Sequence, residues 1–139
     1  MNQDQDQDQT PHRVLIVDDS KVIRSSLTSL MKEFGFEIFV AADGIEGLEQ
    51  LKTHWPLDLA LVDWEMPRMT GIEMVKAVRE HSEYQDLKIM MVTTLNTFQQ
   101  VAAALKAGAD EYHMKPVARE SLEAKLQMMN LLPFLEPSV

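Results

Sequence analysis

The chain has 139 residues, no cysteine and a formal net charge of −9, which comes from 13 basic and 22 acidic side chains. This length suits one domain, and the lack of cysteine excludes disulfides, thiolate nucleophiles and zinc ribbons. The negative charge disfavours nucleic acid, and no apolar run approaches the length that crosses a bilayer, so we expect a cytoplasmic domain that binds neither nucleic acid nor membrane.

The two ends of the chain differ from its middle. Residues 1–10 largely alternate Asp with Gln and have no apolar side chain after the first residue, so they cannot offset the entropy cost of ordering. We expect a disordered acidic tail over 1–11, a folded domain over 12–131 and a C-terminal extension over 132–139. The apolar residues 131–135 are expected to pack back against the domain, with a partner-binding motif as the alternative.

Between these ends, strand and helix patterns alternate about every ten residues. This alternation predicts an α/β fold: a flavodoxin-like, doubly wound sheet of five parallel strands with five helices. The strands are nearly continuous apolar runs, as expected when both faces of a sheet are covered. We expect strands at 13–17, 36–41, 57–62, 88–92 and 111–114.

The helices are predicted from apolar residues at helical spacing and from residues that start or stop a helix. The first is expected over 21–34, ending at Gly35 in a left-handed conformation, and the last over 119–131. Asp43 is expected to cap the second helix, which carries Ile45, Leu48 and Leu51. The third is expected to carry Ile72, Val75 and Val78, and the fourth Phe98, Val101, Ala102 and Leu105 before a stop at Gly108.

Polar groups follow the ends of four of these strands. Asp18 and Asp19 follow the first strand, Asp63 follows the third, Thr93 the fourth and Lys115 the fifth. The carboxyl ends of parallel strands lie along one edge of a sheet, which is where open α/β folds keep their chemistry. Taken singly, each residue has an ordinary structural reading such as a helix cap, but their joint placement predicts one shared cleft.

The residue types in this cleft suit a hard metal ion and a phosphoryl group. Three carboxylates at close range repel one another unless a cation lies between them, and Mg²⁺ combines a few carboxylates with water and phosphate oxygens. Asp63, at the end of the central apolar strand, is the expected nucleophile, and its attack on phosphorus would form an aspartyl phosphate. Lys115 and the metal would share the phosphoryl oxygens, and Thr93 would donate a hydrogen bond.

Five segments carry recognisable motifs: Val14-Leu15-Ile16-Val17-Asp18-Asp19-Ser20, residues 63–71, Val92-Thr93-Thr94, residues 107–112 and Lys115-Pro116. Together they resemble the receiver domains of two-component response regulators. The resemblance covers residues 12–131, is strongest to the single-domain chemotaxis type, and implies the strand order 2-1-3-4-5.

The resemblance implies a role for each matching residue. Asp63 would be the phosphoacceptor, and Mg²⁺ would be held by Asp18, Asp19, Asp63 and the backbone carbonyl of Glu65. Thr93 and Lys115 would contact the phosphoryl group, and the peptide before Pro116 would be cis.

The same resemblance implies an output switch and a surface that it changes. Tyr112 would turn inward when the hydroxyl of Thr93 moves toward the phosphate. The resulting partner face, on the fourth helix, the fifth strand and the last helix, is expected to include Val101, Leu105, Lys106, Tyr112 and Lys125.

Two residues depart from the common pattern at positions that influence how water reaches the acyl phosphate. Leu95 offers no polar group to orient water, so we expect slow self-dephosphorylation. The second of these residues is Glu65, whose carboxylate can act on the water and would oppose the effect of Leu95.

The resemblance implies a histidine kinase as phosphodonor and a downstream protein target, with the flagellar motor switch as a candidate target and a phosphatase as a further partner. We expect a monomer that catalyses only its own phosphorylation and dephosphorylation. Two alternatives stay open: a phosphate sink for a shared kinase, and a receiver that binds proteins without phosphorylation. Haloacid dehalogenase-type enzymes need two aspartates two residues apart after the first strand, and flavodoxin-like binders need a phosphate loop there, so residues 18–21 fit neither.

Overall fold

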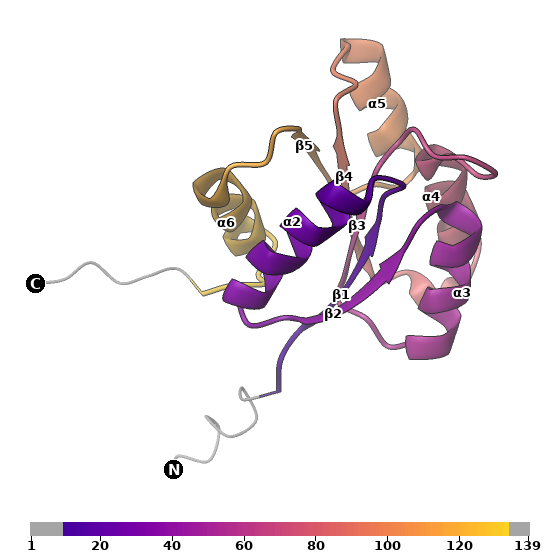
Figure 1. Cartoon of the computed structure of the whole chain (residues 1–139). Coiled ribbons are helices and arrows are strands. Elements are labelled where there is room, and N and C mark those ends of the chain that lie inside the picture. Colours follow the sequence, from indigo (N-terminus) through magenta and orange to yellow (C-terminus); the bar gives the residue numbers. More distant parts are fainter. Residues whose placement is uncertain (1–9, 134–139) are drawn as a thin grey trace, which may run out of the picture.

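The computed structural model describes residues 10–133, which form a central parallel sheet with helices on both faces (Figure 1). The strands are β1 (Arg13–Val17), β2 (Glu37–Ala41), β3 (Leu59–Val62), β4 (Lys88–Thr93) and β5 (Glu111–Met114), in the order β2-β1-β3-β4-β5. The helices are α2 (Lys21–Glu33), α3 (Gly44–His54), α4 (Gly71–Arg79), α5 (Phe98–Ala107) and α6 (Arg119–Met128), and a short 3-10 helix η1 (Ser82–Tyr84) precedes β4. The predicted fold class and strand order are therefore confirmed. Most of the expected acidic tail, and the end of the C-terminal extension, lie outside the described residues.

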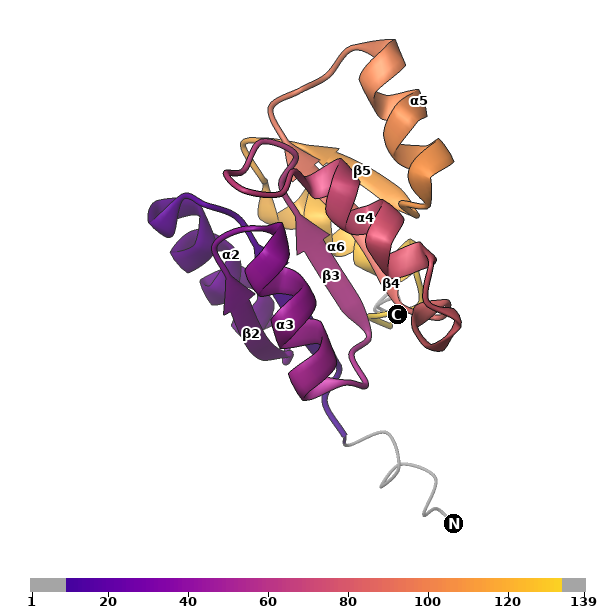
Figure 2. The ribbon, with the colours of Figure 1, turned by 90° about the vertical axis from the view of Figure 1, so that its right-hand side faces the viewer.

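Different helices cover the two faces of the sheet. Helices α3, α4 and α5 pack on one face and α2 and α6 on the other, as two perpendicular views show (Figures 1 and 2). In β1, Leu15 and Val17 join the core under the first group of helices, whereas Val14 and Ile16 join the core under the second. Both faces of the strand are buried, which explains why its sequence is continuously apolar.

Residues in the left-handed conformation end three of the helices. Gly35, with φ of 89°, follows α2, and Gly108, with φ of 123°, follows α5, both as predicted. Asn130, with φ of 63°, ends α6, and the next amide, that of Leu131, donates to the carbonyl of Leu126 at 2.8 Å. This pattern of bonds satisfies the last carbonyls of a helix and turns the chain away. The prediction that the last helix continues to residue 131 is therefore wrong, because Asn130 stops it three residues earlier.

The chain beyond α6 packs back onto the domain over the part that is described. Leu131 is buried, and Leu132 is partly buried against the core formed by α2, α6 and the sheet. The expected packing of the apolar segment is thus confirmed for these two residues. Its remaining apolar residues, Phe134 and Leu135, lie outside the described part of the chain.

Helix α5 is anchored much less deeply than the other helices. Its one fully buried residue is Ala104, while Phe98 is 83% exposed and Leu105 is 48% exposed. The apolar residues predicted for this helix therefore do not form a buried stripe. Ala104 and the partly buried Val101 pack against the core, whereas Phe98 and Leu105 remain on the surface.

Helices α4 and α5 each begin with a capping box. The side chain of Thr70 accepts from the amide of Glu73 at 3.3 Å, and the Glu73 carboxylate accepts from the Thr70 amide at 2.9 Å. Thr97 and Gln100 make the same reciprocal pair at the start of α5, at 3.2 and 3.0 Å. These bonds satisfy amides that have no partner inside the helix, so each helix start is fixed by its own sequence.

None of the helices within residues 10–133 has the length and apolar character that crossing a bilayer requires.

Candidate functional site

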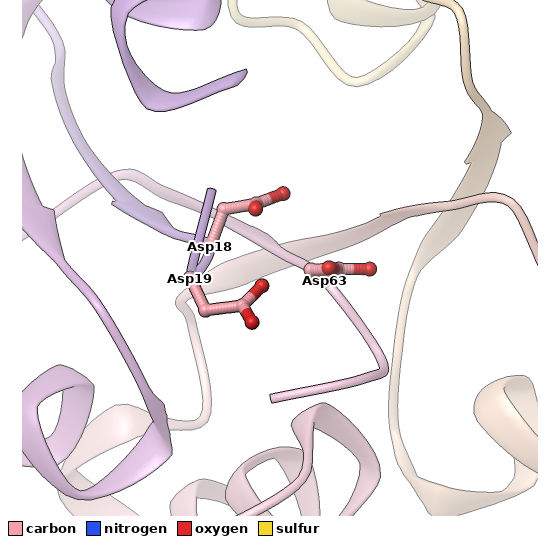
Figure 3. A group of neighbouring side chains, drawn as sticks. All are labelled: Asp18, Asp19 and Asp63. Carbon is pink, nitrogen blue, oxygen red and sulfur yellow. The ribbon is translucent and has the colours of Figure 1, made fainter. Parts of the chain in front are cut away.

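Three carboxylates converge at the carboxyl edge of the sheet. Asp18, Asp19 and Asp63 each offer an oxygen, and these oxygens all lie within 4.8 Å of one another (Figure 3). Asp18 and Asp63 are buried, whereas Asp19 is exposed. The predicted meeting of residues 45 positions apart is therefore observed, and it follows from the pairing of β1 with β3.

The backbone ladders place two of these carboxylates. The Asp63 amide donates to the carbonyl of Val17 at 2.9 Å, and the Asp18 amide donates to the carbonyl of Ala41 at 3.1 Å. Both bonds continue the sheet ladder one residue beyond the strands. The two side chains therefore leave the sheet from adjacent, rigid positions, as a metal or catalytic site requires.

Lys115 lies between the two buried carboxylates. Its Nζ is 2.8 Å from Oδ2 of Asp18 and 3.4 Å from Oδ2 of Asp63. The Lys115 amide donates to the carbonyl of Thr93 at 3.0 Å, which fixes the lysine beside the end of β4. The peptide between Lys115 and Pro116 is cis, as predicted. This arrangement brings a cation to within contact distance of the candidate phosphoacceptor.

The charges at this edge oppose one another. Burial raises the pKa of Asp63, and the negative charge of Asp18 raises it further, while Lys115 acts in the opposite direction. Burial disfavours the charged form of Lys115, but its hydrogen bond to Asp18 and the charges of both carboxylates prevail and raise its pKa. The site therefore holds more negative charge than one lysine balances, which is the condition that favours a bound cation.

The residues present fit a magnesium ion by the chemistry of their donors. Mg²⁺ prefers hard oxygen ligands and uses a small number of carboxylates, and the Asp18, Asp19 and Asp63 oxygens are close enough to serve one ion. Within residues 10–133 this is the one cluster of acidic, histidine or cysteine side chains with such spacing.

Thr93 and Tyr112 both contact the backbone of Leu95. Thr93 is buried, and its hydroxyl oxygen accepts from the Leu95 amide at 3.4 Å. The hydroxyl of Tyr112 donates to the Leu95 carbonyl at 2.5 Å, and the ring is buried. Burial raises the pKa of Tyr112, and the charge of Asp63 adds to the effect. One residue of the loop after β4 thus joins the two predicted switch side chains.

Glu65 and Leu95 face the same hollow beside the carboxylates. Glu65 is exposed and Leu95 is partly buried. The hollow is lined by Asp19, Trp64, Glu65, Met66, Pro67, Thr70 and Leu95. Both residues predicted to tune dephosphorylation therefore line one hollow together with Asp19, one with a charged and one with an apolar side chain.

The predicted partner face is only partly accessible. Leu105 and Lys106 are exposed and Val101 is partly buried. Tyr112 is 8% exposed, so its ring adds little to this face in the structure. The ammonium group of Lys125 is already engaged within the domain. It donates to the backbone carbonyl of Tyr112, and its Nζ lies 3.7 Å from Oε1 of Glu111. Phe98, which was not predicted for this face, is its most exposed large apolar residue.

Sequence reasoning also missed residues that support the site from behind. Arg24, one turn into α2, donates to the carbonyl of Asp18 at 2.7 Å, and the Ser20 amide donates to the Asp18 carboxylate at 2.9 Å. A Cβ on Gly71 would lie 2.0 Å from the carbonyl oxygen of Asp63, so only glycine lets α4 begin so close to the phosphoacceptor candidate. The glycine stands in the motif at 63–71, but Arg24 had no signal beyond its charge.

Comparisons with known proteins agree with this geometry. Residues 14–127 match the family model described as the response regulator receiver domain. The chain is 34% identical over 118 residues to chemotaxis protein CheY1 of Helicobacter pylori, covering 84% of this chain and 95% of that protein. It is 35% identical over 116 residues to a CheY homolog of Campylobacter jejuni, covering 83% and 89%.

Solved structures give the same result. The CheX-CheY-BeF3-Mg complex of Borrelia burgdorferi contains a chain that is 32% identical, with a TM-score of 0.81, covering 86% of this chain and 90% of that one. CheY4 of Vibrio cholerae is 37% identical, with a TM-score of 0.80, covering 86% and 98%. The matched family, the order of the strands and the acidic cluster at the carboxyl edge all agree, and the chain belongs to the response regulator receiver domain family, of the single-domain CheY-like type.

Proposed function

We propose that this protein is a two-component signalling receiver that accepts a phosphoryl group on Asp63 from a histidine kinase in the cytoplasm. One observation carries the proposal: Asp18, Asp19 and Asp63 converge within 4.8 Å, and Lys115 contacts two of them. Mg²⁺ would be held by these three carboxylates and by the backbone carbonyl of Glu65. When bound, the metal would neutralise charge on the phosphoryl oxygens.

The chemistry asks little of the protein beyond placing the reacting atoms. A carboxylate oxygen of Asp63 attacks phosphorus, the new oxygen–phosphorus bond forms, and the nitrogen–phosphorus bond of the phosphohistidine breaks. The bonding pair of electrons leaves with the imidazole nitrogen. Lys115 moves from its carboxylate partners to a phosphoryl oxygen, where its charge offsets that of the transferred group. The protein catalyses this step on itself and turns over no small molecule.

The proposed switch uses the bonds to Leu95. When Asp63 carries a phosphoryl group, the Thr93 hydroxyl donates to it and gives up the amide of Leu95. The loop after β4 then shifts, and the Tyr112 hydroxyl holds its carbonyl in the new position. Because α5 is anchored mainly through Ala104, a shift of this loop changes the exposed surface of α5 at little cost.

The output is proposed to be a chemotaxis signal passed to a downstream protein such as the flagellar motor switch. The resemblance to CheY1 of Helicobacter pylori supports this choice. The crystal structure of a related CheY with CheX, BeF3 and Mg supports a second protein partner and the use of Mg²⁺. A phosphatase is a further proposed partner. A phosphate sink for a shared kinase uses the same chemistry and differs only in lacking the downstream target.

The test is intact mass spectrometry after incubation with a small acyl phosphate, with and without Mg²⁺. The expected result is one phosphoryl adduct that requires Mg²⁺ and is absent from Asp63→Asn. Asp86→Asn is the matched control, because this exposed carboxylate lies outside the acidic cluster, and it should be modified like the native chain. Modification of Asp63→Asn to the same extent would reject Asp63 as the acceptor.

A second experiment separates a motor-directed regulator from a phosphate sink. The phosphorylated and unmodified proteins are each titrated with purified flagellar motor switch protein. Tighter binding of the phosphorylated form supports a motor target. Equal binding by both forms, together with rapid draining of phosphate from a kinase shared with another receiver, supports the sink.

A further inference from the structure

The loop between β3 and α4 is tied to a distant helix by one ion pair. Nε of Arg68 lies 2.8 Å from Oδ2 of Asp43, the residue that caps α3. These two residues are 25 positions apart, and Asp43 is 5% exposed. The loop concerned, residues 64–70, follows Asp63 directly and contains Glu65.

Asp43 uses its two carboxylate oxygens for two separate purposes. Oδ1 accepts from the amide of Glu46 at 2.9 Å, which caps α3, and Oδ2 accepts from Arg68. The hydrogen bond to Arg68 is the main reason that the pKa of Asp43 is lowered. Since capping needs only one oxygen, the second oxygen is available for the loop without loss of the helix cap.

Arg68 has an unfavourable backbone conformation. Its φ is 65°, a left-handed conformation that glycine adopts freely and that branched or long side chains disfavour. Glycine would relieve this strain but could not reach Asp43. The presence of arginine at a position that favours glycine therefore points to a requirement for its side chain.

Two further contacts hold the same part of the loop against α3. The Gly44 amide donates to the carbonyl of Met69 at 3.4 Å. A Cβ on Gly44 would lie 2.7 Å from Cγ of Met69, so the helix start and the loop are packed as closely as glycine allows. At the other end of the loop, the Gly71 amide donates to the carbonyl of Trp64 at 2.9 Å. The loop is thus fixed at both ends, and Glu65 lies between the fixed points.

We propose that Arg68 and Asp43 are positioning residues that hold the β3–α4 loop so that the backbone carbonyl of Glu65 faces the metal position beside Asp63. The inference rests on the proposed magnesium site. Neither side chain touches the metal or the phosphoryl group. Their effect is to arrange the one proposed ligand that comes from a loop and not from the end of a strand.

The test compares variants that remove the ion pair while keeping the local backbone and the helix cap. Arg68→Gly removes the side chain and relieves the left-handed residue. Asp43→Ser keeps a capping oxygen for α3 and removes the oxygen that Arg68 uses. Mg²⁺ affinity is measured by calorimetric titration, and thermal stability is measured in the absence of Mg²⁺.

We expect each variant to bind Mg²⁺ about tenfold more weakly, the size typical for loss of a residue that supports a metal ligand. The double variant should be no weaker than either single one, because both remove the same contact. At saturating Mg²⁺ the rate of phosphorylation by an acyl phosphate should return to the native value. Arg68→Lys should recover part of the affinity, since it restores the charge without the planar guanidinium.

Unchanged Mg²⁺ affinity in Arg68→Gly would overturn the proposal, as would weakening that adds fully in the double variant. Hydrogen exchange of the loop amides without Mg²⁺ separates this proposal from the function on which it rests. Faster exchange over residues 64–71 in Arg68→Gly is expected whether or not the metal binds. If the native protein binds no Mg²⁺ while the loop still loosens, the proposed metal site fails and the ion pair is only a structural contact.

Discussion

The two edges of the sheet handle charge in opposite ways. At the amino edge, Arg79 donates to the carbonyls of Tyr84, Leu87 and Gly108 and pairs with Asp110 at 3.0 Å. At the carboxyl edge, Asp18 and Asp63 are both buried and share one lysine. The amino edge satisfies its charges within the chain, whereas the carboxyl edge leaves negative charge for a ligand. The amino ends of the strands thus contribute to stability, and the carboxyl ends of the same strands form the ligand site.

Arg79→Ala should have the largest effect on stability. The change leaves several backbone carbonyls and Asp110 without their partner, and we expect a loss of about 3 kcal/mol in the free energy of unfolding, measured by urea denaturation. Arg119→Ala is the control, because its ion pairs with Glu33 and Glu123 lie at the surface and should contribute less than about 1 kcal/mol. Similar losses in the two variants would contradict the special role of the amino edge.

Adding Mg²⁺ should stabilise the carboxyl edge specifically. A ligand that binds only the folded state adds about 1.4 kcal/mol at ten times its dissociation constant. The native protein should show this gain in urea denaturation, and Asp19→Asn should show less, since it removes one of the three carboxylates. An equal gain in both proteins would mean that Asp19 does not hold the metal.

Asp63→Asn should stabilise the protein at neutral pH in the absence of Mg²⁺. Burial, and then the charge of Asp18, raise the pKa of Asp63 above its unfolded value, so ionisation of this carboxylate opposes folding. The stability that its protonated form contributes is present below the unfolded pKa and is lost as the pH rises through the folded pKa.

Asparagine cannot ionise, so the variant should unfold a few degrees higher than the native protein at pH 7. The difference should shrink when the pH is lowered toward the ordinary pKa of aspartate. Thermal unfolding in the presence of a chelator measures both quantities. If the difference in unfolding temperature between the two proteins grew as the pH was lowered, this explanation would be wrong.

Leu95→Glu should have the smallest effect, and it acts on lifetime and not on stability. A carboxylate at this position of the hollow can orient water toward the acyl phosphate, so the phosphoryl lifetime should shorten by less than about tenfold, equivalent to less than about 1.4 kcal/mol in the barrier. The lifetime is measured as the rate at which the phosphorylated protein loses its phosphoryl group. Leu95→Met keeps the apolar surface and should leave the lifetime unchanged, whereas a longer lifetime in Leu95→Glu would reject the idea.

The sequence predicted the carboxyl edge well because its residues come at fixed points of a regular pattern. Asp18, Asp63 and Lys115 each stand directly beyond an apolar strand, and a parallel sheet brings such positions together whatever the loops do. The limits of β1 were equally well marked, since both of its faces are buried, whereas β3 begins at Leu59 and not at the predicted residue 57.

The missed features depend on contacts between segments far apart in the sequence. Nothing near Arg68 indicates that it reaches Asp43, and nothing near Arg79 indicates the carbonyls that it binds. The end of α6 was missed because asparagine is an infrequent substitute for glycine at a helix end. The exposure of Phe98 was missed since periodicity marks an apolar face but does not show whether another element covers it.

Because α4 and α5 each begin with a capping box, the two loops before them can be changed without changing where the helices begin. Thr70 with Glu73, and Thr97 with Gln100, start their helices without help from the residues before them. Residues 94–96 can therefore be exchanged as a set, and those of the 64–69 loop can be exchanged with Met66, Arg68 and Met69 kept, while the helix register stays in place. A library restricted to these short stretches would vary phosphoryl lifetime and metal affinity on an unchanged scaffold, which makes this receiver a convenient starting point for building signalling timers.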